Sequence, residues 1–206
     1  MKFIIGTKAG MTQVFDENGV CKAATILKVE PAKVSQVKTV ETDGYTALQI
    51  ASGEQKAHRV SKAEKGHFGT GAKLVREYRP RFGEEDTTAT VAKDTKLDAS
   101  VFAPGDVIAV SAVSKGKGFQ GVVKRHGFAG GFRTHGQKHS EREPGSIGQT
   151  GLMRVAKGTR MAGRMGSDTV TIKNLVVLQV NVAENVLLVG GAIPGRKGTL
   201  VEVRGI

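Results

Sequence analysis

The chain has 206 residues, and its 31 Lys and Arg stand against 19 Asp and Glu, for a formal net charge of +12 at pH 7. Its length and its 39% hydrophobic content are enough for a real core, which excludes wholesale disorder, while no apolar run is long enough for a membrane span or a signal peptide. We therefore expect a cytoplasmic protein that binds a polyanion, with nucleic acid the first candidate and an anionic membrane surface the second.

Short strands are expected near the start of the chain. Thr12–Phe15 and Ala23–Val29 flank the turn residues Asp16–Gly19, which predicts a hairpin, and Tyr45–Ala51 is a further predicted strand. Cys21 is the only cysteine, which excludes an internal disulfide framework and a multi-cysteine zinc site. Because it falls within a predicted strand, we expect Cys21 to be a small apolar filler and not a nucleophile.

The middle of the chain is less regular. Residues 53–102 have weak periodicity, charged patches such as Glu84-Glu85-Asp86, and one predicted helix around Gln55–Lys65. We interpret these residues as a small inserted α+β subdomain. Asp106–Val113, which comes after a Pro-Gly turn, is an apolar run and predicts the next strand.

The last part of the chain returns to a strand pattern. Apolar residues alternate with mainly polar neighbours, as in a half-buried strand, at Val170, Ile172, Val176, Leu178, Val180 and Val182. Val186–Val189 and Leu200–Val203 are two further short strands on either side of a Gly-Gly break. Several short strands at this spacing predict a mainly β fold, either a barrel or a sandwich.

Most of the net charge lies in one segment, residues 115–165. It holds eleven Lys and Arg, two acids (Glu141 and Glu143), and twelve of the 28 glycines. Loops longer than roughly 12–15 residues are unusual inside a compact domain, and only a short helix, about Phe119–Arg125, is expected here. Since the strands on both sides belong to one core, we interpret the segment as a long basic irregular extension of a body formed by 1–114 and 166–206.

Three patterns in this segment have weaker chemical interpretations. Gly116–Gly121 matches the dinucleotide fingerprint, but a glycine soon ends the helix that follows and no strand precedes the acid Glu141. His135 and His139 have metal-ligand spacing, but glycines argue against a helix there and no carboxylate or cysteine completes a set. Ser146 is not in a nucleophile elbow. We therefore predict no cofactor, no metal and no catalytic activity.

The basic run Lys157–Gly166 indicates contact with nucleic acid. No acid occurs between Pro144 and Ser167, whereas a surface that serves only solubility mixes both signs of charge. Unopposed cations spaced by glycine suit a chain that runs between phosphate backbones. RNA is favoured over DNA, because an irregular segment suits the cavities of folded RNA better than a regular major groove.

Short motifs occur along the whole chain: Gly6–Thr12, Asp43–Tyr45, Gly66–Phe68, Ser114–Phe119, Thr134–Gly136, Pro144–Gln149, Arg160–Gly163 and Gly191–Gly195. In this order and spacing they resemble the bacterial large-subunit ribosomal protein three family. Two stretches depart from the family. His126-Gly127 stands where members usually carry Trp-Asn, so an imidazole replaces a stacking aromatic ring, and Thr150–Met153 replaces a Thr-Pro-Gly turn.

The resemblance implies a β-barrel body like that of translation factors, on the surface of the large subunit. It also implies a long extension through 23S ribosomal RNA toward the peptidyl transferase centre, early binding in subunit assembly, and a structural role that is not enzymatic. The family's loop near the catalytic RNA corresponds to 144–149. Some bacterial members carry a methylated glutamine in this motif, which makes Gln149 a candidate for methylation.

We predict a structural constituent of the large ribosomal subunit that binds 23S rRNA and neighbouring ribosomal proteins, with no membrane or small-molecule partner and no homo-oligomer. The residues expected to contact RNA are Lys115, Lys117, Lys124, Arg125, His126, Arg133, His135, Lys138, His139, Arg142, Ser146, Gln149, Arg154, Lys157, Arg160 and Arg164. Two other classes remain open. One is a nucleic-acid chaperone or DNA-compacting protein that uses the same basic segment; the other is an RNA-modifying enzyme, for which the sequence shows no catalytic constellation.

Overall fold

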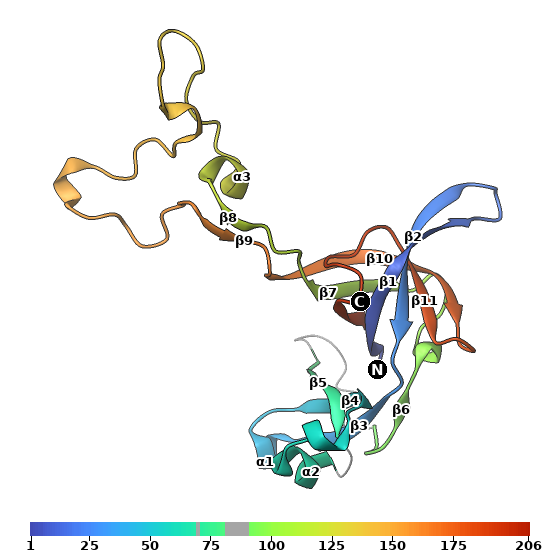
Figure 1. Cartoon of the computed structure of the whole chain (residues 1–206). Helices are drawn as coiled ribbons and strands as arrows, with labels where there is room; N and C mark the ends of the chain where they lie inside the picture. The colour runs from blue at the N-terminus through green and yellow to red at the C-terminus, as the bar shows by residue number, and fades with distance from the viewer. Residues whose placement is uncertain (69–70, 81–90) are drawn as a thin grey trace. The chain divides into compact units, whose positions relative to one another are not determined.

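A computed structural model describes residues 1–68, 71–80 and 91–206. The chain divides into two compact units, one formed by Met1–Val113 together with Thr169–Ile206 and the other by Ser114–Asp168. We call the first unit the body; it contains two antiparallel sheets (Figure 1). The expectation of a mainly β chain is confirmed.

The larger sheet of the body is a closed barrel. Its strands are β1 (Phe3–Phe15), β2 (Cys21–Val29), β7 (Val107–Val113), β10 (Thr169–Asn181), β11 (Val186–Gly190) and β12 (Leu200–Gly205). They follow one another around the barrel in the order β1-β12-β7-β10-β11-β2, and every neighbouring pair is antiparallel. The first strand of the chain therefore lies between the second strand and the last.

The second sheet of the body has the order β5-β4-β3-β6. Its strands are β3 (Ala32–Lys38), β4 (Ala47–Glu54), β5 (Ala72–Tyr78) and β6 (Lys96–Leu97). Its connections contain α1 (Val40–Asp43), α2 (Lys62–Phe68) and a 3₁₀ turn at Ala57–Arg59, and a further 3₁₀ turn, Ala99–Val101, follows β6 on the way to β7. The sheet starts before residue 53, the predicted start of the inserted subdomain, because β3 and β4 pair with β5 and β6 and not with barrel strands. Glu84-Glu85-Asp86 lies outside the described residues.

The helix predicted around Gln55–Lys65 begins later than expected. A 3₁₀ turn precedes it, and α2 starts at Lys62. The reason is a capping box: the backbone N of Ser61 donates to Glu64 Oε2 at 2.9 Å, and the backbone N of Glu64 donates to Ser61 Oγ at 3.2 Å. These two bonds satisfy free N–H groups at the start of the helix. The bond from the Ser61 backbone N, followed by one from the Ser61 hydroxyl to the same carboxylate oxygen, lowers the pKa of the Glu64 carboxyl.

Successive residues of β1 pack into two different cores. Ile4 lies in the barrel interior with Leu27, while Phe3 and Ile5 pack with Leu48 and other residues of the second sheet. All five side chains are at most 5% exposed. Because side chains alternate between the two faces of a strand, one strand holds the two sheets together. Full burial of one Leu or Ile contributes on the order of 1.5–3 kcal/mol.

The longest strand at the C-terminal side, β10, differs from its predicted pattern. Its pairing with β7 shifts register between Ile172 and Leu175, and Asn174 between them has a left-handed φ of +59°. Such an irregularity reverses which residues face inward. Val177 is 1% exposed, whereas Val176 is 40% exposed. The alternation predicted the strand correctly but missed the inward positions Leu175 and Val177. Beyond a second register shift, between Val177 and Gln179, Val180 packs against the barrel core as the alternation predicted.

The prediction that Cys21 is an apolar filler is wrong. Its side chain is exposed at the start of β2, and its Sγ lies 3.4 Å from Gln13 Oε1. At this point β2 pairs with β1 alone, since β11 pairs with β2 only from Ala24 onward. The residue is in a strand, as expected, but that part of the strand covers no core.

We expect the body to fold without the second unit. None of the buried residues in its two cores lies in 114–168, and Val113 is paired with Thr169, so a short linker can join the two strand ends. Replacing 116–165 with a Gly/Ser linker should leave one cooperative thermal transition, since each doubling of loop length changes closure free energy by only about 0.6 kcal/mol. Loss of the cooperative transition would show that the body depends on the second unit.

Candidate nucleic-acid interface

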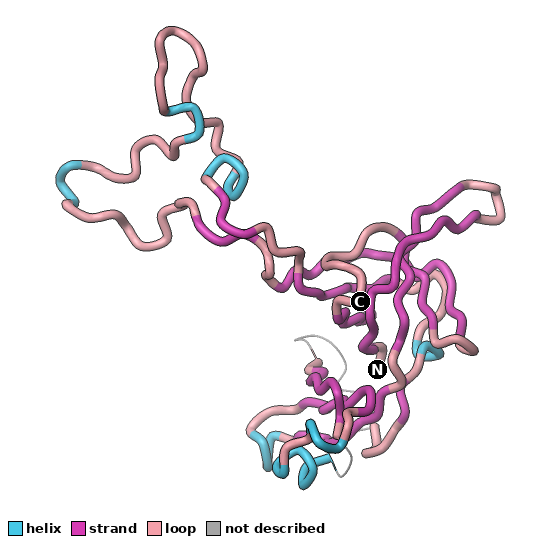
Figure 2. The backbone as a smooth tube through the Cα atoms, viewed as in Figure 1, coloured by secondary structure: helices cyan, strands magenta, loops and turns pink. Residues whose placement is uncertain are grey.

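The second unit, Ser114–Asp168, which we call the basic unit, contains little regular structure (Figure 2). Its elements are β8 (Gly118–Gln120), α3 (Val122–His126), β9 (Gly163–Met165) and 3₁₀ turns at Ser140–Arg142 and Thr150–Leu152. The antiparallel pairing of β8 with β9 was not predicted. The predicted helix, about Phe119–Arg125, begins three residues late because its first residues belong to β8.

Backbone hydrogen bonds join the two ends of the basic unit. The N–H of Ser114 donates to the carbonyl of Asp168, and the N–H of Lys117 donates to the carbonyl of Met165, each at 2.9 Å. Between these bonds Gly166 has a φ of +79°, and a Cβ at this position would lie 2.2 Å from the carbonyl oxygen of Lys115. The two segments approach so closely that only glycine fits at position 166.

Two of the predicted RNA contacts point into the basic unit. α3 ends at Gly127, whose φ of +74° is left-handed. In its last turn Arg125 Nη1 donates to the carbonyl oxygen of Met161 at 2.7 Å, and His126 Nε2 donates to the same oxygen at 3.1 Å. Both side chains are half-buried. Arg125 and His126 therefore hold α3 to the returning chain segment.

The other fourteen predicted RNA contacts are exposed. They are Lys115, Lys117, Lys124, Arg133, His135, Lys138, His139, Arg142, Ser146, Gln149, Arg154, Lys157, Arg160 and Arg164. Every residue of the basic unit is described, and among them Val122, at 2% exposure, is the one buried hydrophobic side chain. Apolar burial this small cannot offset the entropy of ordering more than fifty residues, at about 1–2 kcal/mol each.

Few cations of the basic unit are neutralised within the protein. Arg133 meets Glu141 at 3.1 Å, and the other ten Lys and Arg form no ion pair with any residue that the structure describes. Glu143 and Asp168 are the remaining acids of the unit, so eleven cations stand against three carboxylates. Clustered charge of one sign creates a potential that attracts a polyanion.

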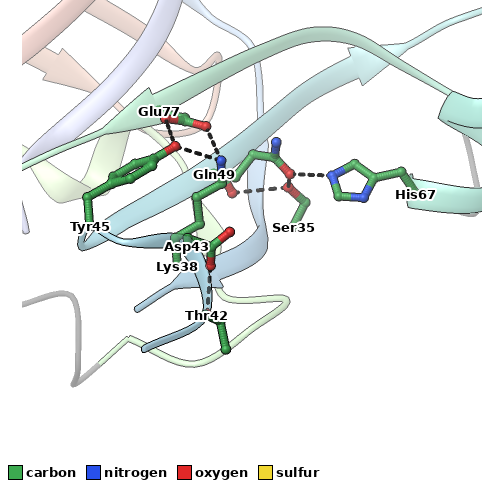
Figure 3. A network of polar contacts seen from close by, with 8 residues as sticks. All are labelled: Ser35, Lys38, Thr42, Asp43, Tyr45, Gln49, His67 and Glu77. Carbon is green, nitrogen blue, oxygen red and sulfur yellow. Dashed lines mark hydrogen bonds and ion pairs between the residues drawn. The ribbon is translucent and has the colours of Figure 1, made fainter. Parts of the chain in front are cut away.

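Among the described residues, five cations of the body form ion pairs with carboxylates. In the second sheet, Lys38 Nζ donates to Glu77 Oε1 at 2.6 Å and to the Tyr45 hydroxyl at 2.8 Å (Figure 3), and the Arg79 guanidinium lies 4.5 Å from the centre of the Tyr45 ring. The hydrogen bond to Glu77, followed by that to Tyr45, raises the pKa of Lys38, and the hydrogen bond from Lys38 lowers the pKa of Glu77. Four more body cations form ion pairs: Lys2, Lys22, Lys73 and Arg76.

The loop that contains the Pro144–Gln149 motif is open and uncharged. Gly145 has a φ of +77°, and the Ser146 hydroxyl donates to the carbonyl oxygen of Gly148 at 3.0 Å. Together with the 3₁₀ turn that follows, the loop surrounds a recess of about 510 Å³ that Gln149 lines. A recess of this size beside exposed polar side chains can receive a group of a folded RNA.

Sequence reasoning missed the large apolar side chains that the basic unit exposes, namely Phe119, Phe132, Ile147, Leu152, Met153 and Val155. Met153 is 97% exposed and Phe132 is 82% exposed. Exposed apolar groups of this size mark contact surfaces, and aromatic rings stack on unpaired bases. The available signal was the occurrence of single large apolar residues among glycines and cations, in a segment without strand or helix period.

Other chemistry has less structural basis. The Gly116–Gly121 motif follows the strand β7, but its glycines overlap β8 and lead into a helix of only five residues, whereas a dinucleotide site needs a full helix there. Within 1–68, 71–80 and 91–206, no three His, Cys, Asp or Glu side chains gather as metal ligands would. The helices of these same ranges are all too short or too polar to cross a membrane.

Comparison with known proteins gives consistent matches. The family model of ribosomal protein L3 matches residues 83–185. A large ribosomal subunit protein uL3 from Thioalkalivibrio sulfidiphilus is 45% identical over 98% of this chain and 95% of its own length. The chain belongs to the ribosomal protein L3 family. Proteins of the same name from Chlorobium phaeobacteroides and Bacillus cereus are 42% and 43% identical, over 98% and 99% of this chain and 98% and 96% of their own lengths.

The residues that match the L3 family model include the basic unit. Residues 83–185 include all of the basic unit together with β7 and β10 on either side of it. The predicted family is thus confirmed. L3 proteins are structural components and not enzymes, which removes the RNA-modifying enzyme from the candidate functions.

Proposed function

We propose that this L3 protein is a structural constituent of the large ribosomal subunit, where it binds 23S rRNA through the basic unit. The observation that carries the proposal is the set of ten Lys and Arg without an ion-pair partner among the described residues, in a unit with one buried apolar side chain. Phosphates would supply the missing negative charge and would fix the path of the chain.

We further propose that the loop around Pro144–Gln149 lies deep in the rRNA, toward the peptidyl transferase centre, and that binding occurs early in subunit assembly. The loop itself is uncharged and exposed, and its recess of about 510 Å³ is lined by Gln149, by exposed apolar side chains such as Met153, and by the cation Arg154. Such a surface suits contact with RNA bases and sugars, with one cation for a phosphate. The exposed amide of Gln149 is also accessible to a methyltransferase before assembly.

Within the subunit the barrel serves as the anchor, of the kind found in translation factors, and the protein acts as a single copy beside neighbouring ribosomal proteins. A nucleic-acid chaperone or DNA-compacting protein would use the same cations. Sedimentation of a cell lysate at high salt distinguishes these functions. A subunit constituent remains with the large subunit, whereas a DNA-compacting protein remains with the nucleoid.

A hydroxyl-radical source tethered at residue 146 should cleave 23S rRNA around the peptidyl transferase centre, and one at residue 56 should not. Lys56 serves as the matched position because it is an exposed residue of the body. Attachment requires Ser146→Cys or Lys56→Cys in a Cys21→Ser chain, since the native Cys21 is exposed. Cleavage of the same peripheral helices from both positions would contradict the deep position of the loop.

A further inference from the structure

The hairpin of β1 and β2 continues beyond the barrel (Figure 1). β12 pairs with β1 only over Phe3–Thr7, and β11 pairs with β2 only over Ala24–Lys28. From Met11 to Phe15, therefore, β1 pairs with β2 alone. Two-stranded ribbons are only marginally stable by themselves in water. Contact with another surface would therefore stabilise the outer part of this hairpin more than the part that belongs to the barrel.

One face of this outer hairpin is uncharged. The register pairs Phe15 with Cys21 and Gln13 with Ala23, and residues two apart share a face. Together with Met11, these residues form one face, which we call the hairpin face, and all five are exposed. Met11 is 52% exposed and Phe15 is 67% exposed.

The charges of the hairpin lie elsewhere. On the opposite face Asp16 forms an ion pair with Lys22. Glu17, in the turn, forms no ion pair with any residue in the described part of the chain. In a protein with a net charge of +12, the outer part of the hairpin, residues 11–25, thus carries an uncharged face beside an acidic turn. All of these residues are described, and their one cation, Lys22, is ion-paired.

We propose that the hairpin face docks onto an apolar patch, with a basic rim, on a neighbouring protein of the large subunit. This inference rests on the proposed function, because it takes its partner from the same subunit. An acidic turn complements Lys and Arg on a partner protein. RNA is the poorer partner, since its phosphates would meet Glu17, and Lys22, the one cation within residues 11–25, is already paired with Asp16.

The test uses the full chain assembled into purified large subunits. Phe15→p-benzoylphenylalanine places a photoreactive aromatic side chain on the hairpin face, and Thr12→p-benzoylphenylalanine places the same group on the opposite, exposed face. Irradiation should give an adduct with one subunit protein from position 15 and much less from position 12. An adduct with rRNA, equal protein adducts from both positions, or no protein adduct from position 15 would overturn the proposal.

A second variant measures the contact itself. Phe15→Ser should weaken binding of the full chain to the protein found in the adduct by about tenfold, as truncation of a central aromatic side chain does at protein interfaces. Thr12→Ser should leave that binding unchanged. Phe15→Ser should also keep the unfolding temperature, because the side chain covers no core. Variants that enter large subunits but give no protein adduct disprove only this inference, whereas a wild-type chain that never enters them disproves the proposed function.

Discussion

Changing Lys157, Arg160 and Arg164 to alanine should make binding to 23S rRNA less sensitive to salt. The negative slope of log affinity against log salt concentration should become shallower by about two to three, because each phosphate contact contributes roughly 0.7–0.9 to its magnitude. The three side chains are exposed and form no ion pair with any described residue. Removing them therefore breaks no internal contact of the protein that the structure shows. Filter binding to 23S rRNA at several salt concentrations measures the slope.

The matched control removes three cations from the body. Lys56, Lys62 and Lys65 are exposed and form no ion pair with a described residue. Their replacement by alanine lowers the net charge by the same amount. We expect a smaller change in slope from this control, since the proposed interface is the basic unit. Equal changes from both triple variants would mean that total charge, and not the basic unit, determines binding.

The second large effect is expected from Gly166→Ala. The new Cβ would lie 2.2 Å from the Lys115 carbonyl oxygen and 3.1 Å from the Gly116 Cα, at a φ of +79°. Neither contact is with a flexible side chain, so the two ends of the basic unit must separate. Backbone strain of this kind costs about 1–3 kcal/mol, which corresponds to rRNA binding that is roughly 5-fold to 150-fold weaker if binding requires the two ends of the basic unit to stay joined.

Gly151→Ala is the control for this substitution. Gly151 has no positive φ, and a Cβ added there would meet no atom within 4 Å beyond its chain neighbours, so alanine fits without strain. The N–H of Lys117 donates to the carbonyl of Met165, so its rate of amide exchange reports whether the two ends of the basic unit stay joined. The exchange rate should rise in Gly166→Ala and stay unchanged in Gly151→Ala. Unchanged exchange and unchanged affinity in both variants would show that the ends tolerate a side chain.

Short apolar runs bounded by turn residues predicted several strands correctly. The hairpin around Asp16–Gly19 and the strands β7, β11 and β12 were expected within a few residues of their bounds. β3 was not predicted as a strand and β4 was counted with the barrel, because assignment to the second sheet depends on pairing with β5 and β6, which lie far along the chain. The inward face of β10 depends on the left-handed conformation of Asn174, which periodicity does not report.

At the candidate interface, composition predicted the charge but not the arrangement of every side chain. Clustering of Lys and Arg with few acids is a property of the sequence, and fourteen of the sixteen predicted residues are exposed. The inward position of Arg125 and His126 depends on the carbonyl oxygen of Met161, more than thirty residues away. A contact between backbone and side chain over this separation has no sequence pattern, which is why single-residue reasoning missed it.

The neighbouring positions of β1 and β12 affect how the protein is made. Phe3 pairs with Arg204 and Thr7 with Leu200, so the barrel closes only after the C-terminal strand is available. During synthesis, one edge of β1 stays unpaired and Ile4 stays without its barrel partners on β12 until residues 200–204 have been added. Pairing across so long a separation is slow, and exposed edges favour aggregation in the interval. In the nascent chain, the exposed edge of β1 therefore needs protection from other chains until β12 has been made.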